Sequence, residues 1–176
     1  MSDISSFRNK NPSIQSKFIS QLEQEFTTIV RLLYSSSVPR PALESQILPY
    51  IAKNIHFKDP LQEGNGKELY RDSIKGFHNL FYFTHDTFQL QIKLNNDGRT
   101  GRCIVDGIIN IRQFSWLYTY PLRAMFVFEF RLLSNPTTDK PQFEIFRHEE
   151  MWFVFCFVCV LNQKKKVESF KGQFVI

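Results

Sequence analysis

Residues 55–66 read IHFKDPLQEGNG, and residues 67–81 continue as KELYRDSIKGFHNLF. Residues 55–59 favour a short strand. It ends at Asp59-Pro60, because proline has no N–H to donate to a sheet. A glycine-rich turn follows. Behind it, apolar residues recur at three- and four-residue spacing and predict an amphipathic helix with one face to bury. These apolar residues are Tyr70, Ile74, Phe77 and Phe81.

Upstream of this stretch the sequence predicts helices. One long amphipathic helix has Ser13 as its N-cap and ends at the serines of 35–37. Its apolar stripe consists of Ile14, Phe18, Leu22, Phe26, Ile29 and Leu33. Residues 42–53 also show helical spacing, but Pro49 interrupts them, so we expect two short helical turns before a strand at 55–59.

Downstream, alternation of apolar and polar residues predicts strands at 87–94, 102–113, 122–133 and from 142 onward. Turn signals separate them. The first of these strands is expected to bury one face, made of Phe88, Leu90, Ile92 and Leu94. Helices followed by a run of antiparallel strands predict an α+β fold, with the helices packed on one face of a curved sheet.

The last predicted strand divides its side chains between two faces. One face carries Glu144, Phe146, His148, Glu150 and Trp152, and the other carries Phe143, Ile145, Arg147, Glu149 and Met151. One of these faces must therefore be lined with charge.

Length and composition favour a single domain. The chain has 176 residues, of which 43% are hydrophobic, so it can bury a complete core. We expect a disordered N-terminus at 1–12, the domain at 13–161 and a basic tail at 162–176.

Charge and cysteine content limit the partners and the compartment. The net charge is +5, but Lys and Arg cluster only in the tail, which favours a solvated basic end and makes nucleic acid unlikely. Three cysteines give no disulfide framework, and no secretory signal is visible, so a cytoplasmic location is expected, with the nucleus left open. The apolar run at 151–161 is too short for a membrane span.

Two apolar segments suggest contacts beyond the domain itself. The connection from Phe114 to Tyr120 is too aromatic for a solvated loop and is expected to form a lid or a subunit contact. The run at 151–161 is apolar on both faces, which predicts burial against a partner and hence a homodimer through the sheet.

In this layout, in the Phe57-Lys58-Asp59-Pro60 turn and in the final HEEMW at 148–152, the chain resembles the nuclear transport factor 2-like superfamily. That superfamily includes the SnoaL-like polyketide cyclases and ketosteroid isomerase, and this chain is most similar to uncharacterised eukaryotic SnoaL-like proteins. The resemblance covers about 13–152. It implies a cone-shaped fold with a hydrophobic pocket for a small molecule.

The resemblance also implies catalytic residues. In ketosteroid isomerase the general base is an Asp before a Pro in the matching turn, which is Asp59 here, and a first-helix Tyr that donates to the oxyanion corresponds to Tyr34. The third carboxylic acid of the isomerase has no counterpart by motif. His148 could act as an acid or base. Without the resemblance, Asp59 is an ordinary turn residue and His148 a member of a salt-bridge network.

The predicted pocket is lined by Phe57, Asp59, Tyr70, Phe77, Trp116, His148 and Trp152. The histidines show no metal-ligand spacing, and nucleotide-binding motifs are absent, so neither a metal nor a cofactor is expected. Three functions stay open. They are a small-molecule-binding domain, a cofactor-independent isomerase or cyclase with Asp59 as base, and a protein-binding adaptor that uses the sheet face.

Overall fold

The computed structural model describes residues 12–37, 39–112, 118–133 and 141–153. The helices are α1 (Pro12–Leu33), α2 (Arg40–Gln46) and α3 (Lys67–Leu80), with a 3₁₀ turn, η2, at Leu48–Tyr50. The strands are β1 (Ile51–Lys58), β2 (Glu63–Asn65), β3 (Tyr82–Leu94), β4 (Thr100–Arg112), β5 (Tyr120–Leu132) and β6 (Phe143–Phe153).

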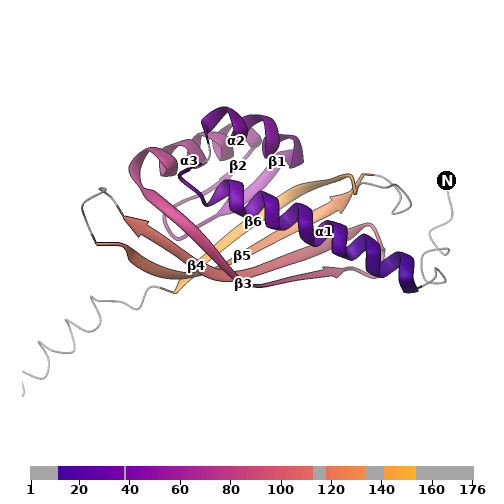
Figure 1. Cartoon of the computed structure of the whole chain (residues 1–176). Coiled ribbons are helices and arrows are strands. Elements are labelled where there is room, and N and C mark those ends of the chain that lie inside the picture. Colours follow the sequence, from indigo (N-terminus) through magenta and orange to yellow (C-terminus); the bar gives the residue numbers. More distant parts are fainter. Residues whose placement is uncertain (1–11, 38, 113–117, 134–140, 154–176) are drawn as a thin grey trace, which may run out of the picture.

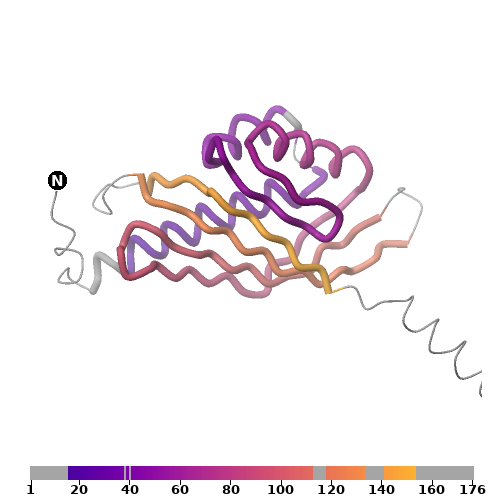
Figure 2. Tube along the Cα trace, turned by 180° about the vertical axis from the view of Figure 1, so that it is seen from behind, coloured from indigo at the N-terminus to yellow at the C-terminus, as the bar shows by residue number. Residues whose placement is uncertain are grey.

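The six strands form one sheet in the order β2-β1-β6-β5-β4-β3. Every neighbouring pair is antiparallel except β1 and β6, which are parallel. The helices lie on one side of this sheet, α1 along the long strands and α2 and α3 over the end that holds β1 and β2 (Figure 1). From behind, the long strands lie uncovered by any helix of the described residues (Figure 2). The predicted α+β fold is confirmed.

The core lies between α1 and the inner face of the sheet. Phe26 of α1 is fully buried, and its ring centroid lies 5.1 Å from that of Phe130 on β5 and 4.9 Å from that of Phe143 on β6. Every second residue of β5 faces this core, namely Leu122, Ala124, Phe126, Phe128 and Phe130. Burial of each aromatic ring contributes roughly 1.5–3 kcal/mol.

Several predicted boundaries are wrong by a few residues. α1 begins at Pro12, so Ser13 lies inside its first turn and is not the N-cap. Proline suits the first helical position because its missing N–H has no helical acceptor there. The two short helical segments around Pro49 are confirmed as α2 and η2, but β1 begins at Ile51, since parallel pairing of Ile51 with Ile145 extends the strand.

The sequence did not indicate β2, which forms a hairpin with β1 across the predicted turn. Phe57 pairs with Gly64, where a Cβ atom would approach the Phe57 ring to 2.9 Å. Only glycine allows this close packing. The hairpin then ends at Gly66, whose φ of 97° favours glycine, and α3 starts directly after it.

A bulge in β3 corrects the predicted burial of Phe88. β3 begins at Tyr82, and its pairing with β4 shifts between Thr87 and Gln89, which leaves Phe88 as the extra residue. The side chain of Phe88 is 61% exposed, whereas Leu90 and Ile92 pack against the core. The prediction that Phe88 shares their buried face is wrong.

A second bulge, in β6, changes which side chains face inward. β5 residues Glu129 and Phe130 pair with Arg147 and Ile145, so Phe146 is the extra residue. Phe143 and Ile145 before the bulge are buried, and so is His148 after it. The prediction that His148 faces away from Phe143 and Ile145 is therefore wrong, because the extra residue shifts the alternation by one.

Other expectations concern residues outside the described ranges. These are the N-terminus, the part of the aromatic connection that includes Trp116, the apolar run beyond Phe153 and the basic tail. Among the described helices, none has the length and hydrophobicity that a membrane span requires.

Candidate functional site

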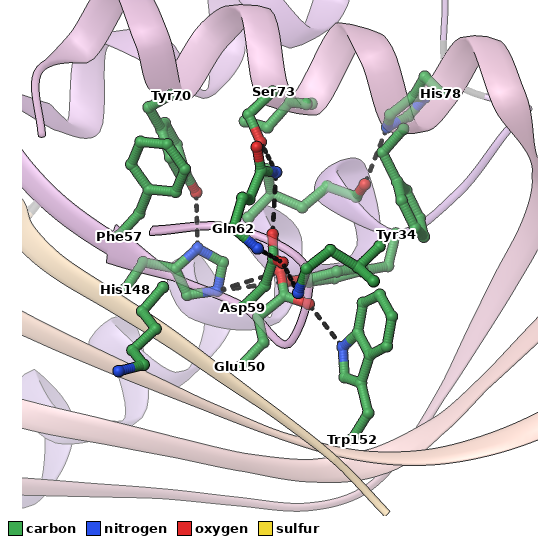
Figure 3. A pocket seen from close by; sticks show the side chains of 15 residues that line it. Tyr34, Phe57, Asp59, Gln62, Tyr70, Ser73, His78, His148, Glu150 and Trp152 are labelled. Atoms are coloured by element: carbon green, nitrogen blue, oxygen red, sulfur yellow. Dashed lines mark hydrogen bonds and ion pairs between the residues drawn. The ribbon is translucent and has the colours of Figure 1, made fainter. Parts of the chain in front are cut away.

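A pocket of about 60 Å³ lies between the end of α1, the turn after β1, α3 and β6 (Figure 3). It is lined by Leu33, Tyr34, Phe57, Lys58, Asp59, Leu61, Gln62, Tyr70, Ser73, Ile74, Phe77, His78, His148, Glu150 and Trp152. Apolar side chains from α1 and α3 form its walls. A buried polar cluster lies at its floor and consists of Tyr34, Tyr70, His148 and Glu150.

His148 is at the centre of this cluster. Its side chain is 4% exposed and stacks on the Phe128 ring with centroids 4.3 Å apart. Its Nε2 lies 3.1 Å from the hydroxyl of Tyr34, and its Nδ1 lies 2.9 Å from the hydroxyl of Tyr70. Burial lowers the pKa of His148 to about 3, so the ring is neutral at neutral pH.

Glu150 is the buried carboxyl group of the pocket, with a side chain 14% exposed. Tyr34 donates a hydrogen bond of 2.5 Å to its Oε1, and the Trp152 indole N–H donates one of 2.8 Å to its Oε2. Burial raises the pKa of Glu150 to about 7, the charge of Asp59 acts in the same direction, and the two hydrogen bonds act against it. This carboxyl group can therefore exchange a proton near neutral pH.

The two tyrosines reach His148 from different segments of the chain. Tyr34 follows α1 directly and stacks on Phe126, whereas Tyr70 lies on α3 and packs against Phe57. Burial, and secondly the nearby charge of Glu150, raise the pKa of both phenols well above the usual value. Both hydroxyl groups therefore stay protonated and available as hydrogen-bond donors.

Asp59 lies at the rim of the pocket, where its carboxylate organises the turn. Its Oδ1 accepts hydrogen bonds from the backbone N–H groups of Leu61 and Gln62, at 2.7 and 2.9 Å. Its Oδ2 accepts a bond of 2.9 Å from the Gln62 side chain, which also donates to Ser73 on α3. The turn thus occupies both oxygens of the residue expected to be the base.

Within the described residues, no group of three or more His, Cys, Asp or Glu side chains could hold a metal ion.

The chain is similar to known proteins in structure. No protein-family model matches the sequence, and no curated protein does. A protein from Novosphingobium aromaticivorans assigned as a scytalone dehydratase is 10% identical, with a TM-score of 0.62 over 82% of this chain and 89% of that chain. Nuclear transport factor 2 from Cryptosporidium parvum is 14% identical, with a TM-score of 0.56 over 76% and 93%.

The chain has the nuclear transport factor 2-like fold. A third similar structure, LinA, is 11% identical, with a TM-score of 0.51 over 64% of this chain and 74% of that one. At these identities the likeness shows the fold alone, so the chemistry of this NTF2-like domain must be argued from its own residues.

In this NTF2-like domain the predicted site residues lie around one pocket, except Trp116, which falls outside the described residues. Those around the pocket are Tyr34, Phe57, Asp59, Tyr70, Phe77, His148 and Trp152. His148 contacts Tyr34 and Tyr70. The hydrogen bonds of the Asp59 carboxylate described above all lie within its own turn. Their roles stay predictions.

Sequence reasoning missed Glu150 as a site residue. The resemblance to ketosteroid isomerase does not select it, because the third acid of the isomerase has no counterpart here by motif. The available signal was strand alternation, which assigns Glu150 to the same face as His148 and Trp152, both of which were selected.

Proposed function

We propose that this NTF2-like domain binds a small molecule that has an apolar body and one polar group. Leu33, Ile74 and Phe77 supply an apolar wall, and the polar cluster supplies the hydrogen bonds. The volume of about 60 Å³ gives room for only a few water molecules, which favours a ligand as small as a single ring.

The observation that carries this proposal is the buried carboxyl group of Glu150 in the floor of a pocket. Burying a carboxyl group costs folding free energy, and groups with shifted pKa values cluster at functional sites. The structural match to a protein assigned as a scytalone dehydratase supports the same conclusion, since such an activity by name concerns a small molecule.

Titration of ¹⁵N-labelled protein with small cyclic ketones, alcohols and phenols tests the proposal. Amide shifts are expected to change around the pocket. Ile74→Trp fills the pocket and should remove these changes, whereas Leu80→Trp on the same helix is the matched control, because Leu80 is 62% exposed. If Ile74→Trp binds the compounds as well as the native chain does, the pocket is not the binding site.

A second candidate function is a cofactor-independent isomerase or cyclase. It is favoured by two carboxyl groups in one pocket, Asp59 at the rim and Glu150 at the floor. Asp59 would take a proton from the carbon next to a carbonyl group, the electron pair would move to the carbonyl oxygen, and Tyr34 or His148 would donate to that oxygen. The substrate oxygen would then compete with Glu150 for the Tyr34 proton.

Exchange of α-protons for deuterium in D₂O tests this second candidate. The native protein should accelerate exchange in a cyclic ketone, and Asp59→Asn should abolish the acceleration. Asp97→Asn is a matched control, because Asp97 holds a similar turn through backbone bonds of 2.9 Å from Arg99 and Thr100. Equal exchange with both variants would exclude Asp59 as the base.

We further propose that the domain forms a homodimer through the uncovered face of the sheet. Ile104 and Val127 lie opposite each other on that face, where Met125 is half-buried as well. Val127→Glu should then shift the sedimentation coefficient of a dimer to that of a monomer. A monomeric native chain would contradict the dimer, and a monomer that also binds none of the small molecules would favour the adaptor.

A further inference from the structure

Four side chains of the pocket form a single file of hydrogen bonds. The hydroxyl of Tyr70 lies 2.9 Å from Nδ1 of His148, Nε2 of His148 lies 3.1 Å from the hydroxyl of Tyr34, and that hydroxyl lies 2.5 Å from Oε1 of Glu150. The ring and the two hydroxyl groups come from β6, from α3 and from the residue after α1, and the file starts and ends at residues that line the pocket (Figure 3).

The number of protons fixes the direction of this file when Glu150 is ionised. Tyr34 has one proton, and the short bond to the carboxylate uses it. The Tyr34 oxygen can then only accept, so Nε2 of His148 carries the ring proton. Nδ1 is left as an acceptor for Tyr70. We assign the Nε2–H tautomer to this state.

Protonation of Glu150 exchanges donor and acceptor in every hydrogen bond of this file. The Trp152 N–H keeps Oε2 as an acceptor, so the new proton lies on Oε1 and donates to Tyr34. Tyr34 then donates to Nε2, and Nδ1–H donates to Tyr70, whose own proton turns toward the pocket. In this shift Tyr70, His148 and Tyr34 each lose one proton and gain one, so a proton that enters at Tyr70 leaves one on Glu150.

We propose that Tyr70, His148, Tyr34 and Glu150 form a proton relay of reversible direction that sets the hydrogen-bonding character of the pocket. With Glu150 protonated, Tyr70 donates to a carbonyl ligand. With Glu150 ionised, the oxygen of Tyr70 accepts from a hydroxyl ligand. This inference rests on the proposed function, because it needs a ligand in the pocket that both ends of the relay line.

The pKa values of His148 and Glu150 suit this relay. His148, with a pKa of about 3, passes a proton without becoming charged, and Glu150, with a pKa of about 7, occupies both states near neutral pH. The other titratable groups that line the pocket are Tyr34, Tyr70, Lys58, Asp59 and His78. Lys58 is paired with Glu63 at 3.0 Å, and His78 bonds the Leu33 carbonyl oxygen at 2.9 Å.

The tautomer of His148 is the direct readout. Nitrogen shifts of the ring, recorded by long-range ¹H–¹⁵N NMR across pH, should show Nδ1–H below about pH 7 and Nε2–H above it, with the ring neutral in both states. A ring that becomes an imidazolium in this range, or that keeps one tautomer throughout, overturns the relay.

Two variants test whether Glu150 controls the tautomer of His148. In Glu150→Gln the Trp152 bond should orient the amide oxygen, so the amide N–H₂ faces Tyr34 and holds His148 as Nδ1–H at every pH. Tyr34→Phe should cut the file and make the tautomer independent of Glu150. Tyr50→Phe is the matched control, because it removes a Tyr–Glu bond of 2.7 Å outside the pocket, and its His148 should switch as in the native chain.

A matched pair of probes, cyclohexanone and cyclohexanol, tests the consequence for ligands. A ketone that binds only the protonated state should lose about tenfold in affinity between about pH 6 and pH 8, and the alcohol should gain affinity over the same interval. A tautomer switch without binding of either probe contradicts the proposed function and leaves the relay standing. Binding of both probes without a tautomer switch supports the proposed function and contradicts the relay.

Discussion

Burial shifts the pKa values of Glu150 and His148 in opposite directions. Glu150 titrates at about 7 when folded against 4.5 for a free carboxyl group, so between these values the folded state binds more protons and stability falls as pH rises. His148 titrates at about 3 against 6.5, so between these values the unfolded state binds more protons and stability rises with pH. The two slopes oppose each other where the windows overlap.

Glu150→Gln should uncover the histidine slope. The variant should gain stability as pH rises from about 3 to about 6.5, and its stability relative to the native chain should increase by on the order of 3 kcal/mol between about pH 4.5 and pH 7. Urea unfolding at a series of pH values measures this difference. Glu149→Gln, on the opposite face of β6, serves as the control, and a pH-independent difference for Glu150→Gln would refute the prediction.

Tyr34→Phe should raise the pKa of Glu150 above its native value, because the hydrogen bond from Tyr34 lowers that pKa. Loss of the bond to a buried carboxylate should cost about 1.5–3 kcal/mol above neutral pH. Tyr50→Phe should cost less, since Tyr50 is only partly buried, whereas Tyr34 is 4% exposed. Denaturant titrations of both variants check the order, and equal losses would argue against a special Tyr34–Glu150 bond.

Among the elements, β6 determines the site through its bulge at Phe146. If Phe146 paired regularly and the strand had no bulge, alternation from Phe143 and Ile145 would direct Arg147 and Glu149 into the core. With it, His148 lies inward at 4% exposure, next to Tyr34 and Tyr70. Tyr70 of α3 then packs over this part of the strand, and β1 pairs with it in the sheet.

Deletion of Phe146 should therefore be tolerated better than deletion of Glu149. Without Phe146 the strand alternates regularly, and His148 and Glu150 still face inward. Without Glu149, Glu150 and Trp152 turn to the uncovered face and the polar cluster is lost. Thermal unfolding of both deletion variants gives the comparison, and equal damage would mean that Phe146 is more than an inserted residue.

For the whole molecule, sequence patterns predict the architecture better than the site. The stripe of α1 and the alternation of β5 repeat without interruption, so their buried faces could be read from periodicity, and the α+β fold followed. The bulges at Phe88 and Phe146 depend on pairing with neighbouring strands, which a single strand does not encode. For that reason alternation assigns Glu150 to the face of His148 and Trp152, but it does not show that this face is the buried one.

The packing of α1 on the sheet should dominate the stability of the molecule. Phe26→Ala should cost about 3–5 kcal/mol, because it leaves a cavity among fully buried rings. Phe88→Ala, at a side chain 61% exposed, should stay within about 0.5 kcal/mol of the native chain. Chemical denaturation of the two variants measures both, and similar losses would contradict the assigned core.

The midpoint of the Glu150 titration, followed by the ¹³C shift of its carboxyl carbon, tests the whole account most directly. A midpoint near 7 is predicted, because the side chain is buried at the floor of the pocket beside Tyr34 and Trp152. A midpoint near 4.5, the value of a free carboxyl group, would mean that Glu150 faces water, and both the proposed pocket and the relay would be contradicted.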